Sequence, residues 1–132
     1  RRNGVKILLL MELYFDLIEN IPEFLAFDTM GEEIYIECEV SPLGTLGHWL
    51  NELVTDIASN EVLIARICIW LNAVYKDPGN YSRDVKNDFG VYLFWALNYS
   101  TIKYLVNHLD TQIISEGRVY LKAIDRNGYQ DF

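Results

Sequence analysis

The pattern of hydrophobic residues is strongest in the middle of the chain. Between Glu61 and Tyr75, twelve of fifteen residues are apolar, and they occupy nearly the whole circumference of a helical wheel. A helix with this pattern is covered by its neighbours or lies in lipid. Such a stretch is too short to cross a bilayer, which needs about 20 residues. The pattern therefore predicts the central helix of a soluble domain, with Trp70 and Leu71 fully buried.

Helical periodicity continues on both sides of this stretch. It predicts an amphipathic helix over residues 5–20, which Pro22 ends because proline pushes the preceding residue out of the α region, and a short helical turn over 23–27. Thr45 is the expected N-cap of the next helix. Further predicted helices cover residues 46–58, 83–97, 101–110 and 111–124, the last interrupted at Gly117. The sequence thus predicts an all-α fold, a compact bundle of five or six helices around a buried central helix, as one domain over residues 1–132.

Residues 28–44 are the least helical part of the chain, because Gly31, Pro42 and Gly44 interrupt it. Apolar residues within it alternate with polar ones at a period of two, as in a strand. The alternation sets Ile34, Ile36, Cys38 and Val40 against Tyr35, Glu37 and Glu39. No second run alternates as clearly, so a strand here would have no partner. We expect an irregular, extended acidic insert laid on the helices, and a short helix is the alternative.

Charge is distributed unevenly along the chain. Residues 7–65 contain twelve Asp and Glu but neither Lys nor Arg, residues 66–132 are close to neutral, and the whole chain carries a formal charge of −8. This asymmetry fits an acidic face that steers and docks a basic protein partner. A face that is merely solvated is the alternative. The charge argues against nucleic-acid binding, which requires a basic surface.

The acidic insert contains the residues that we expect to contact this partner. If Ile34, Ile36 and Cys38 face the helices, Tyr35 and the glutamates beside it point outward together. Tyrosine is also enriched at the centres of protein interfaces. The predicted partner-binding residues are Asp28, Glu32, Glu33, Tyr35, Glu37 and Glu39.

The sequence contains no catalytic or cofactor-binding signature. His48 and His108 are its only histidines, and neither belongs to a set of three or four ligands such as a metal requires. Walker A, GxGxxG, HExxH, GxSxG and EF-hand patterns are absent. We therefore expect both histidines to be structural, with no cofactor, no metal and no enzymatic activity. The tryptophans, Trp49, Trp70 and Trp95, lie on apolar helix faces and are expected in the core.

The cysteines and the first residues of the chain indicate the cellular compartment of the protein. Cys38 and Cys68 lack the spacing of a zinc site, which fits a reduced cytoplasmic compartment, although a disulfide between them stays open. The start resembles a signal peptide, but the apolar run Ile7–Leu10 is too short for one. We expect a cytoplasmic protein without membrane contact, and the oligomeric state stays open.

The order of these elements resembles small bacterial immunity-type proteins of polymorphic toxin systems, in a family of domains of unknown function (DUF7674-like). The first helix ends in an Ile-Pro-Glu-Phe-like turn at Ile21–Phe24, and the acidic segment leads into a Gly-x-Leu-Gly-His-Trp-Leu-like helix start at Gly44–Leu50. A later helix has an apolar end, Val91–Leu97, where such proteins often carry Phe-Leu-Glu and this chain lacks the glutamate. The similarity spans most of residues 11–121 and transfers no functional residues.

The resemblance implies a non-enzymatic immunity protein that neutralises a basic toxin or effector by masking its functional surface. The charge asymmetry independently favours a basic partner. The alternative is a small helical structural or adaptor subunit whose acidic face is only solvated.

Overall fold

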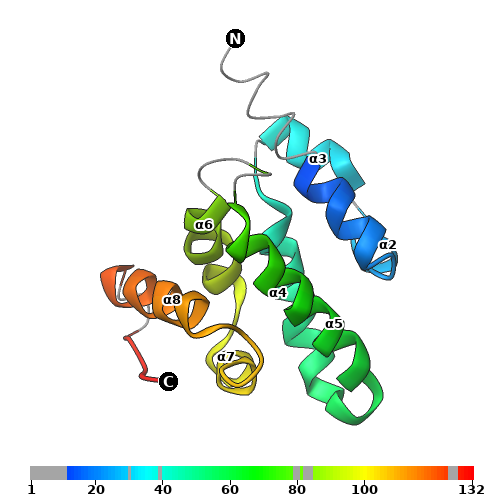
Figure 1. Ribbon diagram of the computed structural model, residues 1–132. Coiled ribbons are helices and arrows are strands. Elements are labelled where there is room, and N and C mark those ends of the chain that lie inside the picture. The colour runs from blue at the N-terminus through cyan, green and yellow to red at the C-terminus, as the bar shows by residue number, and fades with distance from the viewer. Residues whose placement is uncertain (1–11, 30, 39, 79–80, 82–84, 125–127) are drawn as a thin grey trace.

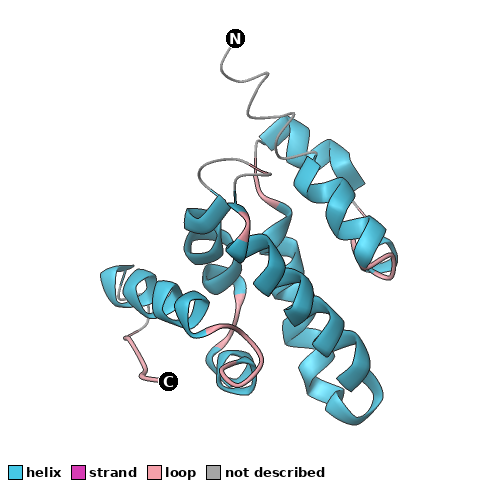
Figure 2. Ribbon diagram, in the orientation of Figure 1, coloured by secondary structure: helices cyan, strands magenta, loops and turns pink. Residues whose placement is uncertain are grey.

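The computed structural model describes residues 12–29, 31–38, 40–78, 81, 85–124 and 128–132, and this part of the chain forms helices without a strand (Figures 1 and 2). The predicted all-α fold is therefore confirmed. The helices over residues 12–38 lie on one side of the long helix α5 (Ile57–Lys76), and the helices over residues 85–124 lie on its other side (Figure 1).

The first described helix covers residues 12–20 and ends before Pro22, as predicted, while residues 5–11 lie outside the described part. A short helix, α2 (Phe24–Phe27), follows it. The next element, α3 (Gly31–Cys38), is helical, so the interpretation as an extended insert is wrong and its helical alternative holds. An extended segment without a partner strand would leave backbone N–H and C=O groups unpaired, whereas a helix pairs them internally. Gly31 begins α3 with a φ of +63°, a left-handed conformation that glycine adopts without strain.

Two helices joined by a 3₁₀ turn form the centre of the molecule. The first, α4 (Pro42–Leu53), begins after Ser41, whose side chain accepts a hydrogen bond from the Leu43 N–H at 3.2 Å. The predicted cap, Thr45, lies inside the helix, because serine followed by proline already forms a complete start signal. The turn η1 (Val54–Asp56) then leads into α5.

The central part of α5 is buried as predicted, but one face of this helix is not covered. Trp70 and Leu71 are 6% and 0% exposed, whereas Val62 and Ile69 are 76% and 68% exposed. The interpretation of α5 as a helix buried on all sides is therefore wrong for the face that carries these two residues. By length and composition alone the stretch Pro42–Lys76 would suffice to cross a membrane, a property that it shares with core helices of soluble proteins.

The second half of the chain continues with shorter helices and one longer one. Its elements are α6 (Val85–Asp88), the π-helix η3 (Phe89–Phe94), α7 (Tyr99–Leu105) and α8 (Thr111–Ile124). The predicted break at Gly117 is wrong, because α8 continues through this residue. Glycine is needed there for close packing, since a Cβ at Gly117 would overlap the ring of the buried Phe94. Residues 83–84 of the predicted helix over 83–97 lie outside the described part.

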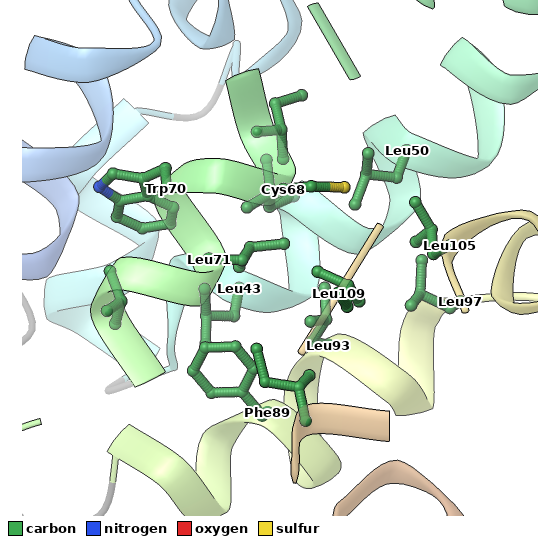
Figure 3. Packing of buried hydrophobic residues seen from close by; sticks show 14 of the residues in the cluster. Leu43, Leu50, Cys68, Trp70, Leu71, Phe89, Leu93, Leu97, Leu105 and Leu109 are labelled. Atoms are coloured by element: carbon green, nitrogen blue, oxygen red, sulfur yellow. The ribbon is translucent and has the colours of Figure 1, made fainter. Parts of the chain in front are cut away.

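Side chains from both halves of the chain meet in one hydrophobic core (Figure 3). Trp49 and Trp70 belong to this core, as predicted. Trp95 is 45% exposed, so the prediction for that residue is wrong. It follows directly after the π-helical turn of η3, and a π-helical turn contains an additional residue that changes which side chains point inward.

Asparagine side chains connect the central helices to the loops around them. Asn72 of α5 donates a hydrogen bond to the His108 carbonyl at 3.2 Å and accepts one from the Asp110 N–H at 2.9 Å. The Asn51 side chain of α4 likewise donates one hydrogen bond to the segment before α7 and accepts one from it. These contacts hold the second half of the chain against α4 and α5.

Candidate protein-binding surface

The exposed acidic residues of α3 form the first part of the candidate surface. Glu33 and Glu37 are exposed and lie one helical turn apart. Like charges at this spacing repel each other and slightly destabilise a helix. The pair therefore does not serve the stability of α3, and it concentrates negative charge at the surface. The side chains of Glu32 and Glu39 lie outside the described residues.

Tyr35 and Asp28 are buried, so their prediction as exposed contact residues is wrong. Tyr35 is 1% exposed, and its ring centroid is 5.3 Å from that of Tyr14 in the first helix. Asp28 is 7% exposed. For Tyr35 the cause is the helical period, because residue 35 of a helix points away from the face that Glu33 and Glu37 share. Asp28 lies outside α3, directly after α2.

Asp28 and Tyr35 form a polar pair inside the protein. Burial raises the pKa of the Asp28 carboxyl, while the Tyr35 hydroxyl and the Gly31 N–H beside it act in the opposite direction. Burial and the nearby Asp28 carboxylate raise the pKa of Tyr35 well above its usual range, while Thr45 lowers it. Neither Asp28 Oδ2 nor the Tyr35 hydroxyl makes a hydrogen bond of good geometry to another described group. The pair positions α3 against its neighbours and is not available to a partner.

Other carboxylates of the acidic part of the chain, residues 7–65, extend the candidate surface beyond α3. They occur on the helix over residues 12–20, at the end of α4 and at the beginning of α5. These exposed residues are Glu12, Glu19, Glu52, Asp56 and Glu61. The uneven charge of the sequence therefore reappears on the described surface, where the first helix, α3, α4, η1 and the beginning of α5 carry these exposed carboxylates.

Arg66 is the first base after Lys6, and an internal ion pair uses its charge. Its guanidinium group lies 2.5 Å from the Glu23 carboxylate and also donates to the Asn20 carbonyl at 3.0 Å. This hydrogen-bonded ion pair lowers the pKa of Glu23. No other ion pair joins two residues that the structure describes. The exposed carboxylates on this side of the protein therefore keep their negative potential.

Asp16 has a structural role that the sequence pattern does not reveal. Its position on the polar stripe of the first helix predicts a solvated side chain, but Asp16 Oδ2 accepts hydrogen bonds from Trp70 Nε1–H at 2.9 Å and from the Tyr81 hydroxyl at 2.7 Å. Burial, followed by the Asp16 hydrogen bond, raises the pKa of Tyr81 well above its usual range. The one available signal is that a buried tryptophan needs an acceptor for its N–H.

The histidines and the described cysteine show no arrangement for chemistry. His48 is exposed, and the ring of His108 stacks on Tyr104 with centroids 4.7 Å apart. In the described part of the chain, no three His, Cys, Asp or Glu side chains gather as metal ligands would. Cys68 is a buried free thiol, and burial raises its pKa to about 12, so it stays protonated and unreactive at neutral pH.

Cavities occur at several places on the described part of the chain. One, of about 580 Å³, lies between the end of α5 and the beginning of α8, and two lysines and Asp110 are among its lining residues. A second cavity of about 230 Å³ lies beside the end of η3 and is lined by Trp95, Leu121 and Ile124 among others. A third, of about 270 Å³, is a surface groove along α5 next to Arg66. The groove is adjacent to the acidic helices, which makes it part of the candidate surface.

No family model, no curated protein and no solved structure matches this chain. The all-α fold is shown by the arrangement of its own helices. The argument for function therefore depends on the charge and exposure of the described residues.

Proposed function

We propose that this chain is a non-enzymatic, cytoplasmic binding protein, a bacterial immunity protein that neutralises a basic toxin or effector by masking its functional surface. The observation that carries the proposal is the set of exposed carboxylates on the first helix, α3, α4, η1 and α5, beside which the described residues hold one ion pair, between Arg66 and Glu23. A surface of one sign attracts a partner of the opposite sign over a distance of about 8–10 Å at physiological salt.

The position of the carboxylates supports binding more strongly than their number does. Glu33 and Glu37 repel each other across one turn of α3. A basic partner would relieve this repulsion by placing a cation between the two carboxylates. Complementary charges of this kind act mainly on association rate and on the choice of partner.

A screen for neutralisation tests the proposal and identifies the partner in the same experiment. Genomic fragments from the source organism are expressed from an inducible promoter, with and without this chain. We expect a fragment that stops growth alone, is harmless when this chain is co-expressed, and encodes a basic protein that forms a complex with it. A protective pair whose toxic member is acidic, or a saturated screen without any protective pair, would contradict the proposal.

A matched pair of variants then tests the location of the surface. Glu33→Gln with Glu37→Gln, and Ser115→Lys with Val119→Lys, each raise the formal charge of −8 by two units, at exposed positions one turn apart. We expect the first variant to protect cells less well and the second, on α8, to protect as well as the wild type. Equal loss in both would assign the effect to net charge, and no loss in either would favour a structural or adaptor subunit.

A further inference from the structure

The first helix and α5 run side by side with a groove between them. Asp16 contacts Trp70 near the end of α5, and Asn20 and Glu23 contact Arg66 one turn earlier. The order of these contacts shows that the two helices are antiparallel. The groove has a volume of about 270 Å³ and is lined by Asn20, Ile21, Arg66, Ile69, Trp70 and Ala73.

The face of α5 that borders this groove is apolar and open to solvent. Val62, Ile69 and Ala73 are exposed, and with the half-exposed Arg66 they recur at the spacing of one helical face. From Val62 to Ala73 this stripe extends for about 17 Å, or three helical turns. Because the Arg66 charge is paired with Glu23, the stripe presents little net charge of its own.

Exposed carboxylates lie beside the stripe. Glu12 and Glu19 lie on the polar face of the first helix, the face from which Asp16 reaches α5. Glu61 is exposed at the other end of the stripe, directly before Val62. The result is a mainly apolar strip of helix with negative charge on the neighbouring first helix and at its N-terminal end.

We propose that this groove binds a basic amphipathic helix of the partner. Such a helix presents apolar side chains at i, i+3 or i+4 and i+7 to a groove, and its flanking Lys and Arg would face the neighbouring carboxylates. The inference rests on the proposed function only for the sign of the partner's charge. It locates the contact on α5 and the first helix, separate from Glu33 and Glu37 of α3.

The same charges argue against two other occupants of the stripe. A symmetric dimer through α5 would place the exposed carboxylates beside the stripe, Glu12, Glu19 and Glu61, of both copies in one interface, and an excess of like charge in an interface is costly. An anionic membrane surface attracts clusters of Lys and Arg, whereas this side of the molecule is acidic. A basic helix is the occupant that satisfies both the apolar stripe and the carboxylates beside it.

A designed peptide serves as the probe. It has about 18 residues, enough to form a helix on a surface, with leucine at helical spacing on one face and lysine on the other. Two controls have the same composition in scrambled order or glutamate in place of lysine. We expect the amphipathic lysine peptide alone to bind, with the largest changes in amide NMR signals at Arg66–Ala73 and in the Trp70 indole N–H signal.

Neutral substitutions test the stripe without altering charge. Val62→Gln with Ile69→Gln should weaken peptide binding by at least about tenfold. Val119→Gln replaces an equally exposed valine of α8, 65% exposed, and should leave binding unchanged. Glutamine favours helix, so both variants are expected to remain folded, and circular dichroism checks this.

Every other outcome would contradict the proposal that the groove binds a basic amphipathic helix. These outcomes are no binding, equal binding of the glutamate peptide, signal changes centred on Glu33 and Glu37, a dimer that the double variant abolishes, and binding to anionic vesicles that it abolishes. Signal changes at α3 would contradict the groove and leave the proposed function intact. Peptide binding at α5 together with a negative neutralisation screen would contradict the immunity function and leave the groove intact.

Discussion

At the scale of single residues, buried polar groups determine how the first helix joins the rest of the protein. The Trp70 indole N–H has its acceptor in Asp16, and Tyr81 bonds to the same carboxylate oxygen. A buried donor without an acceptor costs about 1–3 kcal/mol, so this shared carboxylate contributes to the packing of the first helix on α5. Replacing a tryptophan should therefore lower the free energy of unfolding much more where the side chain is buried than where it is exposed.

Trp70→Ala should lower the free energy of unfolding by about 3–5 kcal/mol, because it leaves a cavity and removes the hydrogen bond to Asp16. Trp95→Ala is the matched control, since Trp95 is 45% exposed and should cost clearly less. Chemical denaturation of both variants measures the two values. Similar losses would show that the burial of Trp70 is not what stabilises the fold.

The Asp28 carboxyl should make stability depend on pH. Its pKa in the folded protein lies above the ordinary value of 3.8, so the folded state binds this proton more tightly than the unfolded state does. Stability of the wild type is therefore lost as pH rises from 3.8 through the folded-state pKa. Asp28→Asn stays neutral and should gain melting temperature relative to the wild type between about pH 3 and pH 7. A difference in melting temperature between Asp28→Asn and the wild type that is constant over this pH range would contradict the raised pKa of Asp28.

Tyr35 shows where prediction from sequence fails for single residues. The alternation of residues 34–40 correctly places apolar and polar side chains on different faces but assigns them at a period of two. At the helical period of α3, Tyr35 is buried while Glu33 and Glu37 stay exposed. An eight-residue helix gives too few turns for its periodicity to be separated from that of a strand.

At the scale of whole elements, close packing explains features that helix propensity does not. Gly117 would be judged a helix breaker from sequence, yet α8 needs glycine there because the ring of Phe94 occupies the place of its Cβ. Gly47 of α4 is similar, since its Cβ would lie 2.9 Å from the Ala96 side chain. The helices themselves could be predicted from periodicity, but these contacts between distant residues could not.

Gly117→Ala tests this packing. Alanine is favoured over glycine in a helix by about 1 kcal/mol, but overlap with the fully buried Phe94 costs about 1–3 kcal/mol. We expect a net decrease in melting temperature. Ser115→Ala, an exposed position of the same helix, should leave it unchanged or raise it slightly. A more stable Gly117→Ala protein would show that α8 does not pack closely on η3.

At the scale of the whole molecule, the charge asymmetry of the sequence divides the described helices, because the elements up to the beginning of α5 carry most of the exposed carboxylates and the later helices most of the bases. It could be predicted because residues 7–65 contain neither Lys nor Arg. The open apolar face of α5 could not, since Val62 and Ile69 look like core residues in a helix that is apolar all round. An acidic side with an uncovered apolar stripe is expected of a protein that binds a basic partner.

The association rate as a function of salt is the most direct test of this account. For the basic partner from the neutralisation screen, we expect the rate to fall as NaCl rises from about 50 to about 300 mM, because exposed charges are then screened. Glu33→Gln with Glu37→Gln should give a slower rate and a weaker salt dependence, while Ser115→Lys with Val119→Lys follows the wild type. A rate that does not change with salt, or that falls equally in both variants, would contradict recognition through the acidic side.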